Sequence, residues 1–394
     1  MWRPVSIALT LLACSSEEGG TAANTGGTAA GGAGGAVGGA GGAVGDASWP
    51  DGESGGSSSG GSSGSSSGGM PSGGSGGTTP TGTCTRLGTW KQTAPFADDS
   101  HVSHPLPSFG VGGRYWVHTM ASGGGERVLK LAQQNADGSL GAWQTASPDH
   151  GGGPHGFTAV VVNGEPYHFR NGHIARYPFD SSGKMTGDVV LIESNPDTTF
   201  GTNRYVWDSA LVASVGGKSW VIHLGGFSFT GYTYKPNVYR SSVPIQPAFT
   251  ALGIDHPAAR PGKCAFSSPF LFTGEGNGAK LWRTKVAADG KLDPWTALGS
   301  LPAGTDNQRG DWFVIDGTLF VVRGAKVFGA KLDAQGGLGS FVEQPALAEA
   351  QVDMSWGDAH LEGSAHAVLG NFVYLTGKKA VHYAPVLKNQ PCTP

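Results

Sequence analysis

The chain has 394 residues, a formal net charge of −3 and 68 glycines. A charge this small, with no basic stretch standing out along the chain, argues against nucleic acid as a partner. The length suits one large domain or two smaller ones. Glycine is concentrated toward the N-terminus, which separates a low-complexity part from a part of more ordinary composition.

Residues 1–13 have the pattern of an export signal. Arg3 supplies a positive start, and the apolar run from Val5 to Ala13 is too short to span a bilayer. The run ends in Leu11-Leu12-Ala13-Cys14, which resembles the lipobox of bacterial lipoproteins. This resemblance implies cleavage before Cys14 and lipidation of its thiol and new amino group, so that the chain is anchored to a membrane. The alternative is a plain secretory signal that is cut near Ala13 or later.

The residue after the cysteine bears on the destination of such a lipoprotein. Ser15 follows Cys14, and no aspartate stands there. By resemblance to the sorting rule of bacterial lipoproteins, this favours the outer membrane. We therefore expect an outer-membrane lipoprotein that faces either the periplasm or the cell surface.

Residues 14–83 are predicted to be a disordered tether behind the lipid anchor. Glycine, serine, alanine and threonine dominate, and Trp49 and Met70 are almost the only large apolar side chains. Such a segment cannot bury enough surface to offset its chain entropy. A glycine- and serine-rich coil of this length has a root-mean-square span of about 45 Å, so it can hold a domain clear of a lipid surface.

From Cys84 onward, short runs of aromatic and β-branched residues alternate with turn residues, which is typical of an all-β domain. A repeated unit ends in Leu-x-x-aromatic, at Leu140–Trp143, Leu292–Trp295 and Leu338–Phe341. A strand and a turn with Asp-Gly or Gly-Gly precede each copy, so each unit reads as a hairpin. A further copy at Leu87–Trp90 lacks its first strand.

Six runs qualify as the third strand of a repeated four-stranded unit. They begin at Val128, Ile174, Val238, Leu281, Val327 and Val381. Units of four strands that recur every ~45–65 residues indicate the blades of a β-propeller. The glycine pair in Leu224-Gly225-Gly226, after a second strand, resembles the kelch-type propeller family. The resemblance covers residues 84–394, which we predict to be a kelch-like six-bladed β-propeller.

The two ends of this domain complement each other. No fourth strand follows the sixth third strand, and Leu87–Trp90 is a fourth strand without a blade, so the N-terminal strand is expected to close the ring. Cys84 lies just before that strand and Cys392 just after the last third strand, so we expect the two to form a disulfide, which an exported protein can keep. Cys264 is then left over. We expect it to be a buried thiol in an inner strand, the alternative being an exposed reactive thiol.

The repeated tryptophans Trp90, Trp143 and Trp295 occupy one position of the blade. A large flat side chain fills the wedge between neighbouring sheets, so we interpret these residues as packing between blades rather than as ligand-stacking residues.

A binding site is expected at one mouth of the central channel, where loops enter the innermost strands. The residues eight positions before the turn of each innermost hairpin are mostly polar, and further polar and aromatic residues lie close to them in sequence. The candidate binding residues are His104, His155, Arg204, Trp207, Asp208, Gln308, Arg309, Asp311, Trp356, Asp358, His360 and Glu362. Aromatic faces beside such polar groups suit a sugar or a peptide segment. The alternative is that these loops are polar only because loops generally are.

Four of these candidates, His104, His155, Asp208 and Glu362, are of metal-ligand types. They come from separate loops, however, and no His-x-His, His-Glu-x-x-His or Cys-x-x-Cys pairing accompanies them. We therefore expect neither a metal nor another cofactor.

The resulting interpretation is a monomeric, membrane-anchored binding or scaffolding module for a glycan or protein partner in the cell envelope. The alternative is an envelope polysaccharide hydrolase or lyase with its site at the channel mouth, and a third is a purely structural protein. An enzyme requires two carboxylates, or a carboxylate and a histidine, within reach of each other in the channel, with perturbed pKa values. A binding module requires only a broad polar face.

Overall fold

The computed structural model describes most of the chain from residue 82 to residue 392, and every element in it is a β-strand. The predicted signal, the lipidation at Cys14 and the predicted tether up to residue 81 lie outside the described residues. The last two residues assigned to the tether, Gly82 and Thr83, are described, and Thr83 begins a strand. Among those described there is no helix long and apolar enough to cross a membrane. The described ranges are 82–96, 108–120, 127–148, 158–170, 173–187, 190–193, 205–206, 209–228, 233–245, 249–259, 261–275, 278–302, 311–348, 366–377 and 379–392.

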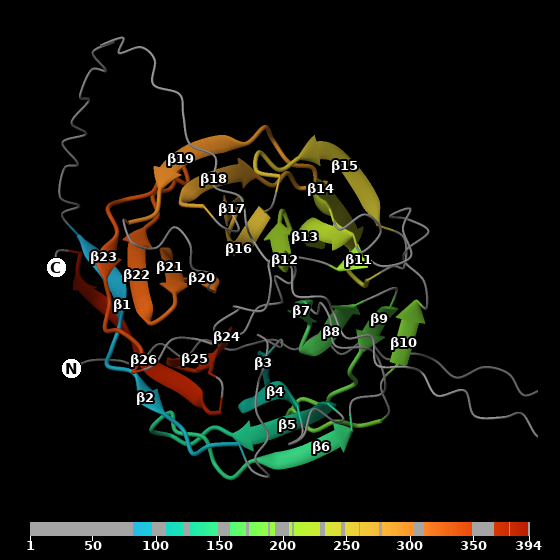
Figure 1. Cartoon of the computed structure of the whole chain (residues 1–394), viewed down its shortest axis with the longest axis vertical. Coiled ribbons are helices and arrows are strands. Elements are labelled where there is room, and N and C mark those ends of the chain that lie inside the picture. The colour runs from blue at the N-terminus through green and yellow to red at the C-terminus, as the bar shows by residue number, and fades with distance from the viewer. Residues whose placement is uncertain are drawn as a thin grey trace, which may run out of the picture. The chain divides into compact units, whose positions relative to one another are not determined.

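The strands form six antiparallel sheets arranged in a ring, with one short innermost strand of each sheet at the centre (Figure 1). The predicted six-bladed β-propeller is therefore confirmed. Blade one contains β3 (Ser108–Val111), β4 (Arg114–Met120), β5 (Arg127–Gln133) and β6 (Gln144–Pro148). Blade two contains β7 (Thr158–Val162), β8 (Glu165–Arg170), β9 (His173–Arg176) and β10 (Val190–Glu193). Blade three contains β12 (Ser209–Val215), β13 (Lys218–Ser228), β14 (Thr233–Ser242) and β15 (Thr250–Asp255), with β11 (Tyr205–Val206) paired to β13.

The remaining three blades follow the same order from the centre outward. Blade four contains β16 (Pro261–Ser267), β17 (Phe270–Glu275), β18 (Lys280–Lys285) and β19 (Thr296–Ser300). Blade five contains β20 (Trp312–Ile315), β21 (Thr318–Arg323), β22 (Lys326–Lys331) and β23 (Val342–Glu343). Blade six contains β24 (His366–Leu369), β25 (Phe372–Thr376) and β26 (Val381–Pro391), and its outer edge is formed by β1 (Thr83–Leu87) and β2 (Lys91–Gln92).

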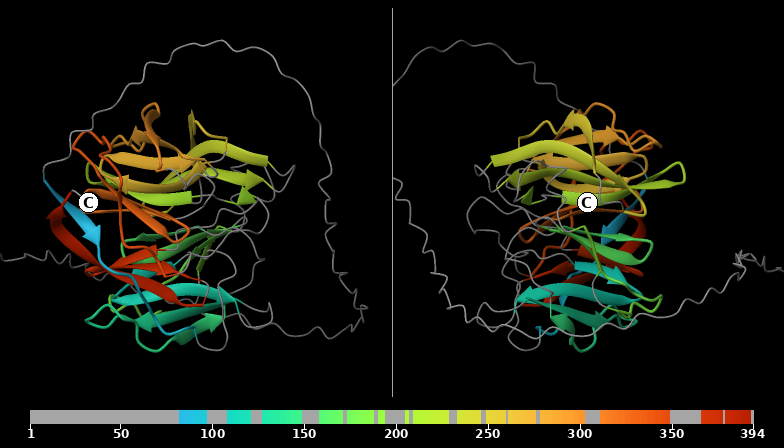
Figure 2. Two further views of the ribbon diagram at one scale, coloured as in Figure 1. Left: turned by 60° about the vertical axis from the view of Figure 1, so that its left-hand side comes forward. Right: turned by 90° about the vertical axis from the view of Figure 1, so that its right-hand side faces the viewer.

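The N-terminal strand closes the ring, as predicted. β1 runs antiparallel to β26, with Leu87 opposite Val386, and β2 continues along the same strand. Figures 1 and 2 show the blue N-terminal strand beside the red C-terminal strand. A blade assembled from both ends of the chain leaves the ring without an unpaired blade edge at the junction.

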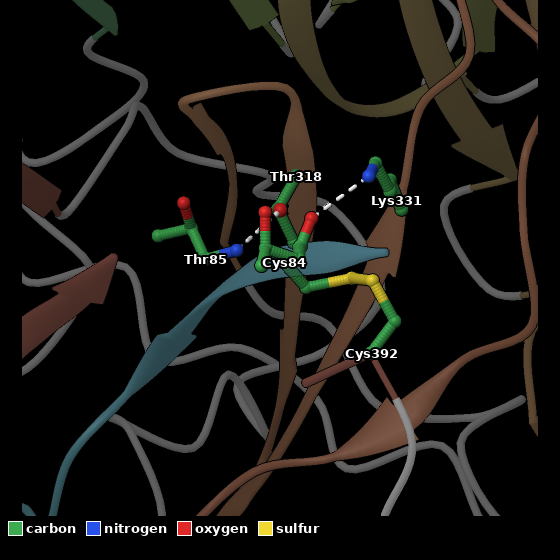
Figure 3. The surroundings of a disulfide bond; sticks show 6 residues. Cys84, Thr85, Thr318, Lys331 and Cys392 are labelled. Carbon is green, nitrogen blue, oxygen red and sulfur yellow. Dashed lines mark hydrogen bonds between the residues drawn. A yellow bond between two sulfur atoms is a disulfide. The ribbon is translucent and has the colours of Figure 1, made fainter. Parts of the chain in front are cut away.

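A disulfide joins Cys84 to Cys392 across this junction, between residues 308 positions apart whose Cα atoms are 5.0 Å apart (Figure 3). The closing strand is also held by blade five. The Thr85 amide donates to Thr318 Oγ1 at 3.3 Å, and Lys331 Nζ donates to the Thr83 carbonyl at 2.7 Å. β1 is therefore fixed to its own blade covalently and to the neighbouring blade by hydrogen bonds.

The turn between the third and fourth strands is built alike in four blades. In each, a bridge pairs two residues that are six positions apart. Between them, an aspartate accepts the amide two residues further on, and a glycine has a positive φ. The aspartates are Asp137, Asp180, Asp289 and Asp333, and the glycines are Gly138, Gly183, Gly290 and Gly336. Three of these turns are the repeated units found in the sequence. The copy in blade two lacks the Leu-x-x-aromatic ending and was missed.

Two of these turns are bound by a side chain of the neighbouring blade. Tyr374 of blade six donates to the Gly138 carbonyl of blade one at 2.7 Å. Trp220 of blade three donates to the Ala288 carbonyl of blade four at 3.3 Å, and a Cβ added to Gly290 would lie 2.5 Å from the Trp220 ring. Only glycine fits there, because the backbone conformation and the close aromatic ring both exclude a side chain.

The hydrophobic core lies mainly between blades, and the repeated tryptophans belong to it. Trp90 is 7% exposed and packs with residues of blades five and six. Trp143 meets Phe96 edge to face at 5.0 Å between ring centroids, and Trp295 meets His256 at the same distance. Their interpretation as packing residues between blades is confirmed.

Candidate functional site

Of the twelve binding residues expected from the sequence, Asp311 alone belongs to the described part of the structure. The other eleven lie outside the described residues: His104, His155, Arg204, Trp207, Asp208, Gln308, Arg309, Trp356, Asp358, His360 and Glu362. The site described below is therefore built from the innermost strands rather than from those loops.

A cavity of about 300 Å³ lies among the innermost strands β7, β12, β16, β20 and β24, which Figure 1 shows around the centre of the ring. Much of its wall is apolar, and the apolar side chains include Val160, Val212, Phe266, Val314 and Val368.

The polar side chains of this cavity are Ser209, Lys263, Asp311 and His366. Each stands at or near the beginning of an innermost strand, and these strands enter the ring in the same direction. The fold therefore brings four polar groups from four blades to one end of an otherwise apolar channel.

Asp311 and His366 form a close pair at this end. Asp311 Oδ2 lies 2.9 Å from His366 Nδ1, and the two side chains are 3% and 21% exposed. The other carboxylate oxygen accepts the Trp312 amide at 2.9 Å, and the imidazole packs at 4.9 Å on the ring of Phe313. The carboxylate is thus held from two sides, and the imidazole ring is held by both a hydrogen bond and an aromatic contact.

The surroundings keep this carboxyl group ionised. Burial by itself raises the pKa of Asp311, but the facing His366 charge and hydrogen bond, the charge of Lys263 and the Trp312 amide together hold the pKa below its ordinary value. An ionised carboxylate on Nδ1 fixes the ring and leaves Nε2 as the nitrogen that exchanges protons. The pair is therefore suited to general acid–base catalysis.

Two neighbours on blade four, Lys263 and Cys264, complete the cavity wall, and the second of them contacts Ser209 of blade three. Lys263 is 9% exposed and lies close enough to Asp311 for its charge to act on that carboxyl. Cys264 is a buried free thiol whose sulfur lies 2.8 Å from Ser209 Oγ, and burial raises its pKa to about 12. Cys264 is thus the buried inner-strand thiol expected from the sequence, and its thiol stays protonated rather than acting as a nucleophile.

Metal binding has no support within the described ranges. No group of three or more histidine, cysteine, aspartate and glutamate side chains is placed there to hold a metal ion. The four metal-ligand types weighed from the sequence, His104, His155, Asp208 and Glu362, lie outside those ranges.

Sequence reasoning missed His366, Lys263 and Ser209. They stand four, five and seven residues before the turn of their hairpins, whereas the candidates were chosen around the position eight residues before it. A search for polar residues at the first positions of each innermost strand would have found all three.

No family model and no curated protein matches the chain. Solved propellers are similar to it at low identity. A PQQ-bound aldose sugar dehydrogenase from Streptomyces coelicolor is 11% identical with a TM-score of 0.46, over 78% of this chain and 100% of the other. A gluconolactonase from Xanthomonas campestris is 14% identical with a TM-score of 0.42, over 77% and 100%. A luciferin-regenerating enzyme is 11% identical with a TM-score of 0.44, over 78% and 97%. At these identities the likeness shows the fold alone.

The geometry of this site corrects the interpretation of the domain as a plain binding module for a glycan or protein partner. The channel holds a carboxylate and a histidine 2.9 Å apart, and the carboxyl pKa is perturbed. This is the arrangement that was required of an enzyme. The pair was missed because its histidine begins a strand rather than lying in a loop.

Proposed function

We propose that this protein is a cell-envelope enzyme that cleaves a polysaccharide, as a hydrolase or a lyase, by general acid–base catalysis in the propeller channel. The observation that carries the proposal is the Asp311–His366 pair, with its 2.9 Å contact inside a cavity of about 300 Å³. Pockets that bind small molecules have this combination of an apolar wall and a few convergent polar groups.

The chemistry follows from the geometry of the pair. His366 takes a proton through Nε2, either from a water molecule or from a substrate carbon, and Asp311 stabilises the imidazolium that forms. A positioned general base contributes about 10²- to 10⁴-fold to the rate. The apolar walls pack against the C–H faces of a sugar ring and exclude water, which strengthens the electrostatic interaction within the pair.

The location in the envelope is proposed from the N-terminal sequence. The apolar run before Cys14 and the residue that follows it support a lipid anchor in the outer membrane, with the domain on the periplasmic face or the cell surface. Lipid chains on one cysteine give stable anchoring when more than one is attached. The tether of residues 14–83 then lets the enzyme search the adjacent polymer at high local concentration. The glycine pair Gly225-Gly226 supports a kelch-like origin of the repeat.

The experiment incubates the full chain with a panel of neutral and acidic envelope polysaccharides and measures chain shortening by gel filtration and new chain ends. We expect at least one polysaccharide to be cleaved and Asp311→Asn to lose about 10²-fold or more in rate, because the histidine loses its orienting charge.

The matched control is Asp316→Asn at the other end of β20, an exposed carboxylate that pairs with Lys388 at 3.0 Å. It should cleave like the unchanged chain. Absence of cleavage across the panel, or equal loss in both variants, would overturn the proposal.

A further inference from the structure

We infer that Lys263 binds the carboxylate of a uronic-acid unit and that the enzyme cleaves its polysaccharide by β-elimination; this inference rests on the proposed function. Lys263 lines the same cavity as Asp311 and His366, and its charge acts on Asp311. Among the described residues that line the cavity, Lys263 carries the only permanent positive charge and Asp311 the only carboxylate.

The charges of the described cavity wall suit elimination next to a carboxylate. His366, oriented by Asp311, is a base, and Lys263 is a cation in the same cavity whose charge acts on Asp311. These are the two groups that such an elimination requires. Glycoside hydrolysis uses instead two carboxyl groups, one as acid and one as base or nucleophile, on either side of the bond.

The step balances with these residues alone. His366 takes the proton from the carbon that bears the uronate carboxylate, and Lys263 stabilises the negative charge that spreads into this carboxylate. The electron pair of the C–H bond forms a carbon–carbon double bond, and the glycosidic C–O bond of the neighbouring carbon breaks. The leaving oxygen takes a proton from the imidazolium of His366 or from water, so nothing is oxidised or reduced.

The size and lining of the cavity agree with one sugar unit of this kind. A volume of about 300 Å³ lies at the lower end of the range for ligand pockets. The cavity wall combines valine side chains with the charged or titratable groups of Lys263, Asp311 and His366. A uronate combines matching features, because its ring carries C–H faces and its carboxylate projects from one carbon.

The first experiment measures binding, independently of catalysis. Galacturonate and galactose differ in the carboxylate, and their binding to the full chain is measured by calorimetry. We expect galacturonate to bind and galactose to bind at least tenfold more weakly. Lys263→Gln should remove this preference, whereas Lys326→Gln, an exposed lysine at the start of β22, should keep it.

The second experiment identifies the reaction. Elimination leaves a double bond conjugated to the carboxylate, which absorbs ultraviolet light, whereas hydrolysis leaves none. With polygalacturonate as substrate we expect this absorbance to rise, and Lys263→Gln to lower kcat/KM about 10²- to 10³-fold. If Lys263→Gln does not fold, the wild-type preference for galacturonate and the product absorbance still decide the inference.

The outcomes separate this inference from the proposed function. Cleavage of neutral polysaccharides alone, or cleavage of polygalacturonate without new absorbance, would overturn the inference and leave the enzyme assignment standing. Equal binding of galacturonate and galactose would overturn the role of Lys263. No cleavage of any polysaccharide would overturn both.

Discussion

The disulfide at the ring closure should contribute a large share of the stability of the propeller. Replacing both cysteines, Cys84→Ser with Cys392→Ser, frees two residues that are 308 positions apart. A loop of this length gives about 5–6 kcal/mol in the chain-entropy relation, and removal of native disulfides typically costs about 2–5 kcal/mol. We expect the free energy of unfolding to fall by about 3–5 kcal/mol, because β1 is then held only by its hydrogen bonds and by the packing of Leu87.

The assay is urea unfolding of the full chain, followed by tryptophan fluorescence, with and without a reductant. Cys264→Ala is the control, because that thiol is free and buried and its removal leaves the disulfide intact. The reductant should destabilise the unchanged chain and Cys264→Ala, but not the double serine variant. Equal free energies of unfolding for the unchanged chain and the double variant would refute the reasoning.

Three further predictions concern the scaffold and the cavity. Gly290→Ala should lower the free energy of unfolding by about 1–3 kcal/mol more than Gly217→Ala does. Both glycines have a similar positive φ, but only Gly290 lies against a side chain, that of Trp220. Equal effects of the two substitutions in urea unfolding would contradict this packing. Burial lowers the pKa of His223 to about 3, so the folded state resists protonation that the unfolded chain accepts below about pH 6.5. The contribution of this residue to the free energy of unfolding should be full above that pH and fall by about 1.4 kcal/mol per pH unit toward pH 3. His223→Leu should therefore reduce the dependence of the free energy of unfolding on pH, measured by urea unfolding between pH 7 and 5. An unchanged pH dependence in this variant would contradict the prediction. The Cys264 thiol, with its pKa raised to about 12, should react with a thiol reagent at neutral pH only after unfolding, and rapid labelling of the native protein would contradict its burial.

The fold could be predicted because the sequence pattern of a blade is repeated several times along the chain. Repeated Leu-x-x-aromatic units and Gly-containing turns recur in most blades, and the unmatched copy at Leu87–Trp90 predicted how the ring closes. Blade two was harder to read, because its turn at Phe179–Met185 keeps the aspartate and glycine but loses the aromatic ending.

The site could be predicted only in part, because its members do not stand at the position from which the candidates were chosen. Asp311, Lys263 and His366 stand five, five and four residues before their turns rather than eight, and Asp311 was a candidate only because it lies close in sequence to Gln308. The innermost strands differ in length, so a fixed count from the turn reaches different depths in different blades. The contact of Asp311 with His366 joins blades five and six, and no local pattern in the sequence contains it.

The most direct test of the central claim is the rate of polysaccharide cleavage by His366→Ala in the absence and presence of imidazole. The substrate is the polysaccharide that the unchanged full chain cleaves fastest. We expect the variant to lose about 10²- to 10⁴-fold in rate, and added imidazole to restore part of that rate by occupying the space beside Asp311. A variant that cleaves at the full rate would contradict the assignment of His366 as the general base of an enzyme in this channel.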